Sequence, residues 1–304
     1  MTKPSSRVSV VILCHNQATN LPIILRSLQR QSVQAHQVVI ADDHSNQPIE
    51  RIAVANHCTY VRSERPRTLR QIGMRALARQ QGTIAAKEDV ILYVDGDTIP
   101  APAVIEHALA HHQTKRDVAI KTPRLYHRTM QGQILGLPHR STPVNPAAAF
   151  QAFYSDCFSI RRGTVLGIGG WDSEFTGWGE EDTDLAYRCQ LAGIPLLFPS
   201  DRQCFSVHID HPVNHAANFA TLQHNAARFL RKFPQAAALR LEFLATMNVY
   251  LGSYGPSTGR PATMTSPPAT SDKSISATLS HPWPASTRTT GALTSGPHTD
   301  QRCR

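Results

Sequence analysis

The chain has 304 residues, 41% of them hydrophobic, and a formal net charge of +9 at pH 7, which is typical of a globular protein with one large domain or two small ones. Its apolar runs are too short to span a bilayer, and its scattered basic residues lack the aromatic-interleaved stripe expected for nucleic-acid binding. The moderately basic balance suits an anionic substrate or an anionic membrane surface.

The N-terminus and the cysteines indicate a cytoplasmic protein. The apolar run at residues 8–13 is too short for the core of a signal peptide and is better explained as a strand. The six cysteines form no C-x-x-C pair and match no zinc-site spacing. We therefore expect free thiols in a reducing compartment.

The first third of the chain alternates between apolar runs and stretches of helical spacing. Strands are predicted at residues 8–13, 38–41, 60–61 and 90–94, and helices at residues 21–28 and 69–77. This alternation predicts an α/β fold with a mostly parallel central sheet and helices on both faces. Ligands gather at the carboxyl ends of such strands, so Asp42, Asp43, Asp95 and Asp97 are expected on one rim.

The rest of the chain is less regular. Helices are predicted at residues 101–110, 184–192 and 219–230, and strands at residues 158–160 and 196–198. Residues 123–147 are rich in Pro, Gly, His and Arg and are predicted to form a long loop, either a lid or a solvated basic loop. We assign residues 1–252 to one globular domain and residues 253–304 to a disordered tail rich in Ser, Thr and Pro.

An Asp-Gly-Asp sequence directly follows the predicted strand at residues 90–94. The carboxylates of Asp95 and Asp97 are hard oxygen ligands at a strand end, which suits Mg²⁺ or Mn²⁺ held on a diphosphate. The alternative is a structural turn that ends the strand, because acidic pairs are common in turns.

A second acidic cluster, Glu180-Glu181-Asp182, lies in a glycine-rich stretch with Trp171 and Trp178. A carboxylate here is a candidate general base for an acceptor hydroxyl, and an indole face suits a sugar ring. The alternative is an acidic first turn of the following helix, stabilised by the helix dipole, and both roles can coexist. The two clusters together predict an enzyme that moves a sugar from a nucleotide diphosphate to an acceptor.

Five segments, in order along residues 7–235, resemble the motifs of the family 2 glycosyltransferases of the GT-A fold. They are VSVVILCHNQATNLPIILRSLQRQ, VVIADDHSN, TLRQIGMRALA, ILYVDGDTIP and GGWDSEFTGWGEEDTDLAYRCQLAG. The last is similar to the acceptor-side motif of the branch related to galactosyl- and N-acetylgalactosaminyltransferases. The resemblance implies a GT-A nucleotide-diphospho-sugar transferase that is inverting and uses Mn²⁺ or Mg²⁺. The implied donor is a UDP-linked sugar, and the acceptor is a saccharide or a lipid-linked molecule.

The resemblance also implies roles for single residues. Asp42 and Asp43 would meet the nucleotide, with Arg70 near its base, whereas Asp95 and Asp97 would hold the ribose and the metal, Asp97 more directly. A histidine after the last core strand commonly supplies a third metal ligand in such enzymes. His208 has that position and His211 competes with it, while a surface-loop histidine without a metal is the alternative.

In the galactosyltransferase-like motif, Asp182 matches the catalytic base and Glu181 matches the acceptor-binding acid. Glu180 replaces the glycine common at its position, so the choice between Asp182 and Glu181 as the base stays open.

Two other functions are alternatives, and the second of them uses a similar sheet. A nucleotide-sugar-binding protein without transferase activity is disfavoured because both acidic clusters are intact. A nucleotidyltransferase needs a Gly-rich, basic loop after the first strand, which Cys14-His15-Asn16-Gln17 is not. The basic residues of the last predicted helix would suit a peripheral contact with the inner membrane face, although a solvated helix face explains them as well.

Overall fold

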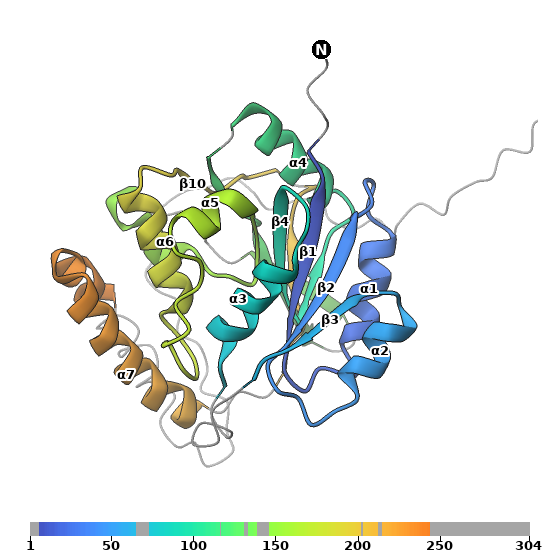
Figure 1. Ribbon diagram of the computed structural model, residues 1–304, viewed down its shortest axis with the longest axis horizontal. Coiled ribbons are helices and arrows are strands. Elements are labelled where there is room, and N and C mark those ends of the chain that lie inside the picture. Colours follow the sequence, from blue (N-terminus) through green and yellow to red (C-terminus); the bar gives the residue numbers. More distant parts are fainter. Residues whose placement is uncertain are drawn as a thin grey trace, which may run out of the picture. The chain divides into compact units, whose positions relative to one another are not determined.

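A seven-stranded mixed sheet forms the centre of the computed structural model (Figure 1). The structure describes residues 6–64, 73–115, 117–130, 133–138, 146–201, 203–211 and 215–243. In sheet order the strands are β10 (Leu196–Leu197), β6 (Ala119–Lys121), β9 (Cys157–Arg161), β4 (Val90–Asp95), β1 (Val8–Cys14), β2 (Gln37–Asp42) and β3 (Thr59–Arg62). Strand β9 is antiparallel to β4 and β6, and the other pairs are parallel, which confirms the mostly parallel sheet.

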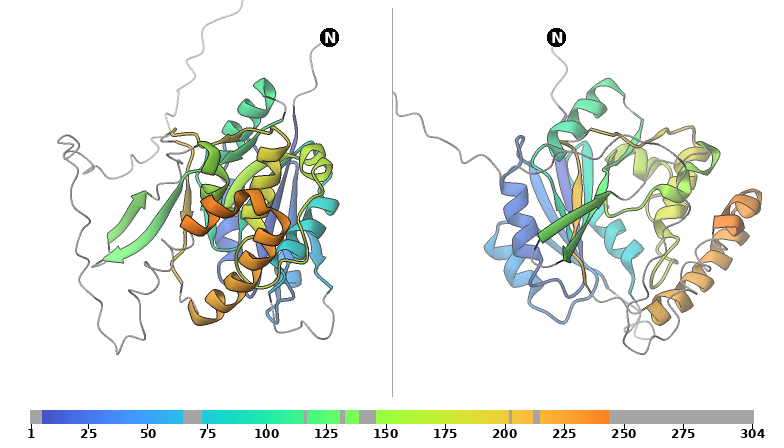
Figure 2. Two further views of the ribbon diagram at one scale, coloured as in Figure 1. Left: turned by 90° about the vertical axis from the view of Figure 1, so that its left-hand side faces the viewer. Right: turned by 180° about the vertical axis from the view of Figure 1, so that it is seen from behind.

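Both faces of the sheet are covered because its inner strands are apolar at successive positions. All seven residues of β1 are buried, so side chains that alternate along it pack on opposite sides. Helices α1 (Leu21–Gln29), α2 (Ile49–Ala55) and α4 (Val104–Thr114) pack on one side, and α1 and α2 are seen in the rear view of Figure 2. Helices α3 (Arg75–Ala85), α5 (Arg162–Gly167) and α6 (Glu181–Leu191) pack on the other, and α7 (His215–Lys232) lies outside α6 and joins the same core through Phe229. The predicted α/β class is therefore confirmed.

A second sheet replaces much of the loop expected at residues 123–147. Its strand order is β5 (Thr98–Pro100), β11 (Ser206–His208), β7 (Arg124–Met130) and β8 (Gln133–Pro138). The loop prediction was wrong for β7 and β8 because β7 pairs with β11, a strand some eighty positions later, and local composition carries no sign of that partner. The pairing between β11 and β5 brings His208 beside Thr98.

Several predicted element limits shift in the structure. The helix expected at residues 101–110 begins at Val104, and the helix expected at residues 184–192 begins at Glu181 and so includes two acids of the second cluster. Short 3-10 turns occupy η2 (Pro146–Ala152) and η3 (Pro234–Ala236). The start of the helix expected at residues 69–77 and the tail at residues 253–304 lie outside the described residues, so the domain boundary stays a prediction.

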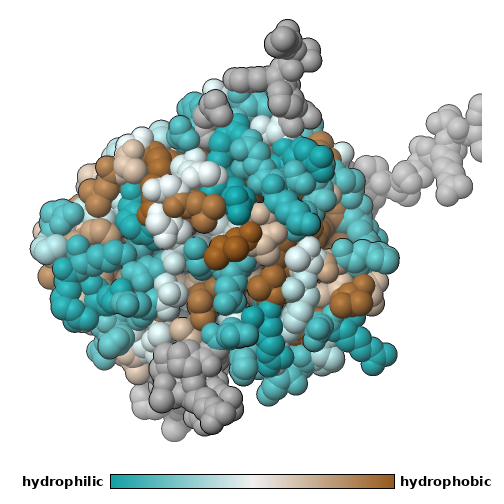
Figure 3. All heavy atoms as spheres, viewed as in Figure 1, coloured by the Kyte–Doolittle hydropathy of each residue, from teal (hydrophilic) through white to brown (hydrophobic). Residues whose placement is uncertain are grey.

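The described surface is mixed in polarity. Figure 3 shows apolar side chains as small patches among hydrophilic ones on the face that carries α3 and α6. Within the described ranges, no helix combines the length and apolar character needed to cross a membrane. Five cysteines in these ranges are free thiols, and four of them are buried.

Candidate active site

The rim expected from the sequence is present at the carboxyl ends of three neighbouring parallel strands. In the strand register, Asp42 lies opposite Cys14 of β1, and Asp95 lies opposite the adjacent Leu13. The acids that end β2 and β4 therefore flank the end of β1. This arrangement follows from parallel pairing, which puts all carboxyl ends of these strands at one edge.

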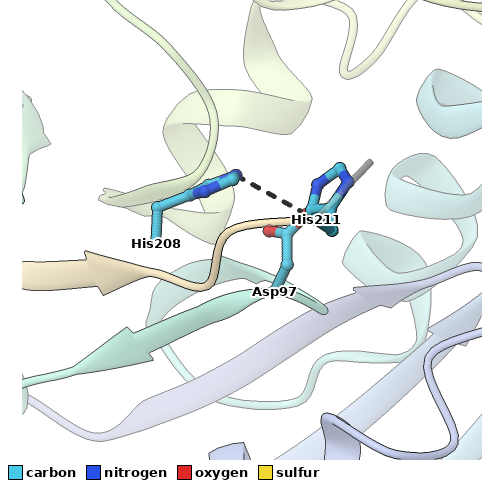
Figure 4. Close-up of side chains that lie close together, drawn as sticks. All are labelled: Asp97, His208 and His211. Carbon is cyan, nitrogen blue, oxygen red and sulfur yellow. Dashed lines mark hydrogen bonds and ion pairs between the residues drawn. The ribbon is translucent and has the colours of Figure 1, made fainter. Parts of the chain in front are cut away.

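Asp97, His208 and His211 form a compact cluster that can hold a metal ion (Figure 4). The Asp97 Oδ2 atom lies 3.1 Å from His211 Nε2 and 3.7 Å from His208 Nε2. One ligand atom from each residue lies within 4.8 Å of the others. The sequence left His208 and His211 as competitors, whereas the fold brings both imidazoles to the same carboxylate. The backbone N–H of Ile209 donates to the Asp97 carbonyl at 2.7 Å and anchors the connection between the histidines.

The pKa shifts of Asp97 and His208 favour the protonation states that bind a cation. Burial opposes ionisation of Asp97, but the hydrogen bond from His211 and the nearby imidazoles hold its pKa below the ordinary value. Burial lowers the pKa of His208, although Asp97 pulls in the other direction. A neutral imidazole and an ionised carboxylate are the forms that bind divalent metals, so the donor set fits such an ion.

Asp95, the other acid of the first cluster, lies outside this group of three ligands. Its Oδ1 accepts a hydrogen bond of 2.7 Å from Arg79 Nη2. Burial raises the pKa of Asp95 to about 6, with Arg79 acting against the shift and Asp97 adding to it. The predicted contacts of Asp95 with ribose and metal stay predictions, and its observed partner is an arginine.

The pair Asp42 and Asp43 lies where β2 ends at the rim. Asp42 is fully buried and accepts hydrogen bonds from the backbone N–H of Ser45 at 2.8 Å and the hydroxyl of Tyr60 at 2.6 Å. Both carboxylate oxygens of Asp43 lie 3.0 Å from the backbone N of Met74. Arg70 lies outside the described residues, so its nucleotide contact and those of the two aspartates stay predictions.

The three consecutive acids of the second cluster have three different environments. Glu180 is buried in an ion pair with Arg240, whose Nε lies 3.1 Å from both carboxylate oxygens. Glu181 is also buried and accepts a hydrogen bond of 3.1 Å from Arg79 Nη1. Asp182 is half-buried, accepts a hydrogen bond from the backbone N–H of Thr183, and makes no ion pair with any other described residue.

Asp182 is therefore the acid best suited to take a proton. Burial raises the pKa of Asp182 to about 7, and the charge of Glu181 adds to the shift while Arg79 opposes it. A carboxylate that titrates near neutrality meets the requirement for a general base. Glu180, the residue that left the choice of base open in the sequence, forms a buried ion pair with Arg240.

Arg79 is the site residue that the sequence did not single out. Its side chain is 2% exposed and contacts both acidic clusters, through Asp95 and through Glu181. A signal was present in the pattern of α3, where Arg79 falls among the small buried residues Ala76, Gly82 and Thr83. A charged residue on a buried helix face needs a partner of opposite charge.

The two tryptophans near the second acidic cluster differ in exposure. Trp171 is 3% exposed and packs edge-on against Tyr93 and Phe158, with ring centroids 5.4 and 6.0 Å away. The expectation that Trp171 offers an open aromatic face was wrong, because its ring completes the core beneath Arg79. Trp178 is half-buried, and its backbone N–H donates to the hydroxyl of Thr221 at 3.0 Å.

Helix α7 holds the loop that presents the second acidic cluster. The side-chain amide of Asn225 donates to the carbonyls of Thr176 and Gly179, both at 2.8 Å. Gly177 has φ +74°, and an added Cβ would come within 2.5 Å of Thr221. The glycine therefore permits both the left-handed turn and the close approach of α7.

The buried pair of Glu180 and Arg240 leads to a prediction about stability. The Arg240→Met variant leaves a buried carboxylate without a cation, so the free energy of unfolding is expected to fall by about 3–5 kcal/mol. Urea unfolding followed by circular dichroism measures the change. The Arg7→Met variant is the control, because the Arg7 side chain is 57% exposed and its surface pair with Glu88 contributes about 0–1 kcal/mol. Equal losses in the two variants contradict the prediction.

Two solved structures have a fold similar to that of this chain. The structure of GalNAc-T7 with UDP, GalNAc and Mn²⁺ superposes with a TM-score of 0.56 at 19% identity, covering 75% of this chain and 48% of that one. The structure of S. aureus TarS 1–349 superposes with a TM-score of 0.56 at 15% identity, covering 74% of this chain and 65% of that one. The chain therefore has the fold of the GT-A glycosyltransferases.

The family model of glycosyl transferase family 2 matches residues 9–162, so the chain belongs to this family, as its motifs predicted. The model described as "N-terminal domain of galactosyltransferase" matches residues 139–212, which contain the second acidic cluster and His208.

Curated relatives have distant similarity. Validoxylamine A glucosyltransferase of Streptomyces hygroscopicus subsp. jinggangensis is 26% identical over 265 residues, covering 75% of this chain and 61% of that protein. Pre-mycofactocin glycosyltransferase of Mycobacterium tuberculosis is 28% identical over 208 residues, covering 64% of this chain and 42% of that protein. Chondroitin synthase of Escherichia coli is 23% identical over 298 residues, covering 81% of this chain and 42% of that protein. The chain thus spans about three-fifths or less of the length of these relatives.

Proposed function

We propose that the chain is an inverting, metal-dependent glycosyltransferase. It would transfer a hexosyl group from a UDP-linked sugar to a hydroxyl of a saccharide or lipid-linked acceptor. The observation that carries the proposal is that one buried cation, Arg79, joins the two acidic clusters, because its guanidinium pairs with Asp95 of the first and with Glu181 of the second. Their sequence neighbours, Asp97 and Asp182, have the chemistry required for donor and acceptor activation.

Asp97, His208 and His211 would hold the cation of the donor complex. When bound there, a divalent cation would neutralise charge on the departing nucleoside diphosphate. Imidazole nitrogens suit Mn²⁺ better than Mg²⁺, which prefers an all-oxygen shell, so the donor set favours Mn²⁺. The GalNAc-T7 structure, which contains UDP, GalNAc and Mn²⁺, supports the choice of donor class and metal.

Asp182 would accept the proton of the acceptor hydroxyl as its oxygen attacks the anomeric carbon. While the new bond forms, the bond from that carbon to the diphosphate oxygen would break on the opposite side, which would invert the configuration in one step. This role is supported by the half-buried position of Asp182 and by its pKa of about 7. Glu181 and Glu180 are bound to Arg79 and Arg240, which makes each less suited to the same role.

Two basic side chains of α7 form ion pairs inside the folded domain. Arg228 and Lys232 form ion pairs with Asp172 at 3.0 and 2.8 Å. These charges explain why α7 stays attached to the loop before the second acidic cluster. Peripheral membrane contact and a cytoplasmic location are thus supported by composition alone.

A donor screen tests the proposal. Purified protein is incubated with a panel of UDP- and GDP-sugars, Mn²⁺ and a mixture of saccharide acceptors, and the released nucleoside diphosphate is counted. Release from one UDP-sugar that requires both Mn²⁺ and acceptor is the expected result. Binding of a nucleotide sugar in calorimetry without any release would instead favour the nucleotide-sugar-binding alternative.

A further inference from the structure

Arg79 occupies a buried position between the two acidic clusters. Its Nη2 lies 2.7 Å from Asp95 Oδ1, and its Nη1 lies 3.1 Å from Glu181 Oε1. The guanidinium carbon lies 5.0 Å from the centroid of the Trp171 ring. One cation from α3 therefore connects the end of β4 to the first turn of α6.

The surroundings of Arg79 hold it in this place. The hydroxyl of Thr83 donates to the Arg79 carbonyl at 2.7 Å and lies 2.6 Å from the hydroxyl of Tyr93. Tyr93 in turn makes a T-shaped contact with Trp171, and the guanidinium lies over the Trp171 ring. The side-chain carbonyl of the next residue, Gln80, accepts the backbone N–H of Trp171 at 2.8 Å. Consecutive residues of α3 thus bind the same segment of the chain.

A buried guanidinium depends on its two carboxylate partners more than an exposed arginine depends on the partner in a surface ion pair. Taking a charge out of water costs several kcal/mol unless ion pairs and hydrogen bonds replace the lost hydration. The planar fork of arginine can bind Asp95 with one nitrogen and Glu181 with another at the same time, which a lysine ammonium cannot do with the same geometry. The width of one guanidinium therefore sets the separation between the carboxylates of Asp95 and Glu181.

We propose that Arg79 is a positioning residue that joins the Asp95-Gly96-Asp97 segment to helix α6 and retains Glu181 as its counter-ion, so that Asp182 serves as the proton acceptor. This inference rests on the proposed transferase function. The side-chain partners of Arg79 are Asp95, Glu181 and the Trp171 ring, so in the proposed role it acts through the two acids.

The charges that face Asp182 make this role measurable. Glu181 and Glu180 are the acids nearest to it on the same helix start, and both raise its pKa. Arg79 from α3 is the facing cation and lowers that pKa. Arg240 pairs with Glu180 and neutralises its charge. Asp95 is connected to the surroundings of Asp182 through its ion pair with Arg79. Removing the charge of Arg79 must therefore raise the pKa of Asp182.

The test compares Arg79→Met, Arg79→Lys and the surface control Arg7→Met. A base must be deprotonated, so kcat/KM falls as the pH drops through its pKa. In Arg79→Met this acidic limb is expected to move upward by about one pH unit, because an opposite charge nearby has been lost. In Arg79→Lys the limb is expected to stay near that of the wild type while kcat falls about tenfold or more, because the charge is retained and the fork is lost.

Carbon-13 NMR gives a readout that does not need turnover. The carboxyl carbons of aspartate are labelled, the signal of Asp182 is assigned with Asp182→Asn, and its pKa is followed in each variant. A raised pKa in Arg79→Met with an unchanged value in Arg7→Met supports the proposal. An unchanged pKa in a folded Arg79→Met protein overturns it, and if that variant does not fold, a wild-type kcat in Arg79→Lys overturns it. A wild type that transfers no sugar refutes the proposed function instead, and the NMR result still decides whether Arg79 controls Asp182.

Discussion

The Asp182→Asn variant is expected to lose about 10²- to 10⁴-fold in kcat while it still binds the donor, because a neutral amide is too weak a base to take the proton of the acceptor hydroxyl. The kinetic constants are measured by nucleoside diphosphate release, and donor binding is measured by calorimetry. A loss confined to kcat is the expected result, since Asp182 belongs to α6, whereas Asp97 lies before β5, His208 ends β11 and His211 follows it.

Glu181→Gln is the matched variant for that prediction. Its loss in kcat is expected to be smaller, because Asp182 remains in place. The charge of Glu181 raises the pKa of Asp182, so removing it lowers that pKa, and the acidic limb of kcat/KM shifts to lower pH. If Glu181→Gln loses more activity than Asp182→Asn, the base has been assigned to the wrong acid.

The Asp97→Ala variant is expected to lose at least about 100-fold in kcat/KM, because the cation that Asp97 is proposed to hold would stabilise the leaving diphosphate by several kcal/mol, and each 1.36 kcal/mol is a factor of ten. EDTA should abolish activity of the wild type, and added Mn²⁺ should restore it. His208→Ala and His211→Ala are each expected to raise the Mn²⁺ concentration for half-maximal activity at least about tenfold, since each deletes one ligand of the cluster.

His107→Ala is the control for the metal prediction, because His107 lies on α4 and pairs with Asp201 at 3.5 Å. It should have the Mn²⁺ dependence of the wild type. Mn²⁺ binding is measured by electron paramagnetic resonance in all variants. Full activity after EDTA treatment, or equal Mn²⁺ affinity in Asp97→Ala and the wild type, contradicts the assignment of the cation site.

Local pattern was sufficient for most of the elements that build the rim. The apolar run at residues 8–13 became β1, and the run before Asp95 became β4, because a continuous apolar segment is stable as a strand when both its faces are covered. The acidic pairs were found for the same reason, since they interrupt an apolar pattern at the point where a strand ends. The helix of the second cluster was also predicted, although it begins at Glu181 rather than Asp184.

Long-range contacts account for what the sequence missed. The hairpin of β7 and β8 was expected to be a loop because its partner strand β11 is remote in sequence. Trp171 was expected to face a sugar, yet Tyr93 and Phe158 enclose it. Arg79 was overlooked because its two acids are 16 and 102 positions away.

The sequence by itself determined the family, the α/β class and the two acidic clusters, because these depend on short motifs and on local apolar periodicity. Only the tertiary structure decided which acid is bound to which cation. It placed His211 beside Asp97 across 114 positions and paired Arg240 with Glu180 across 60, leaving Asp182 half-buried with a pKa of about 7. The affinity of a carboxylate for a proton or a metal depends on burial and on distances through space, and both arise only when remote parts of the chain pack together.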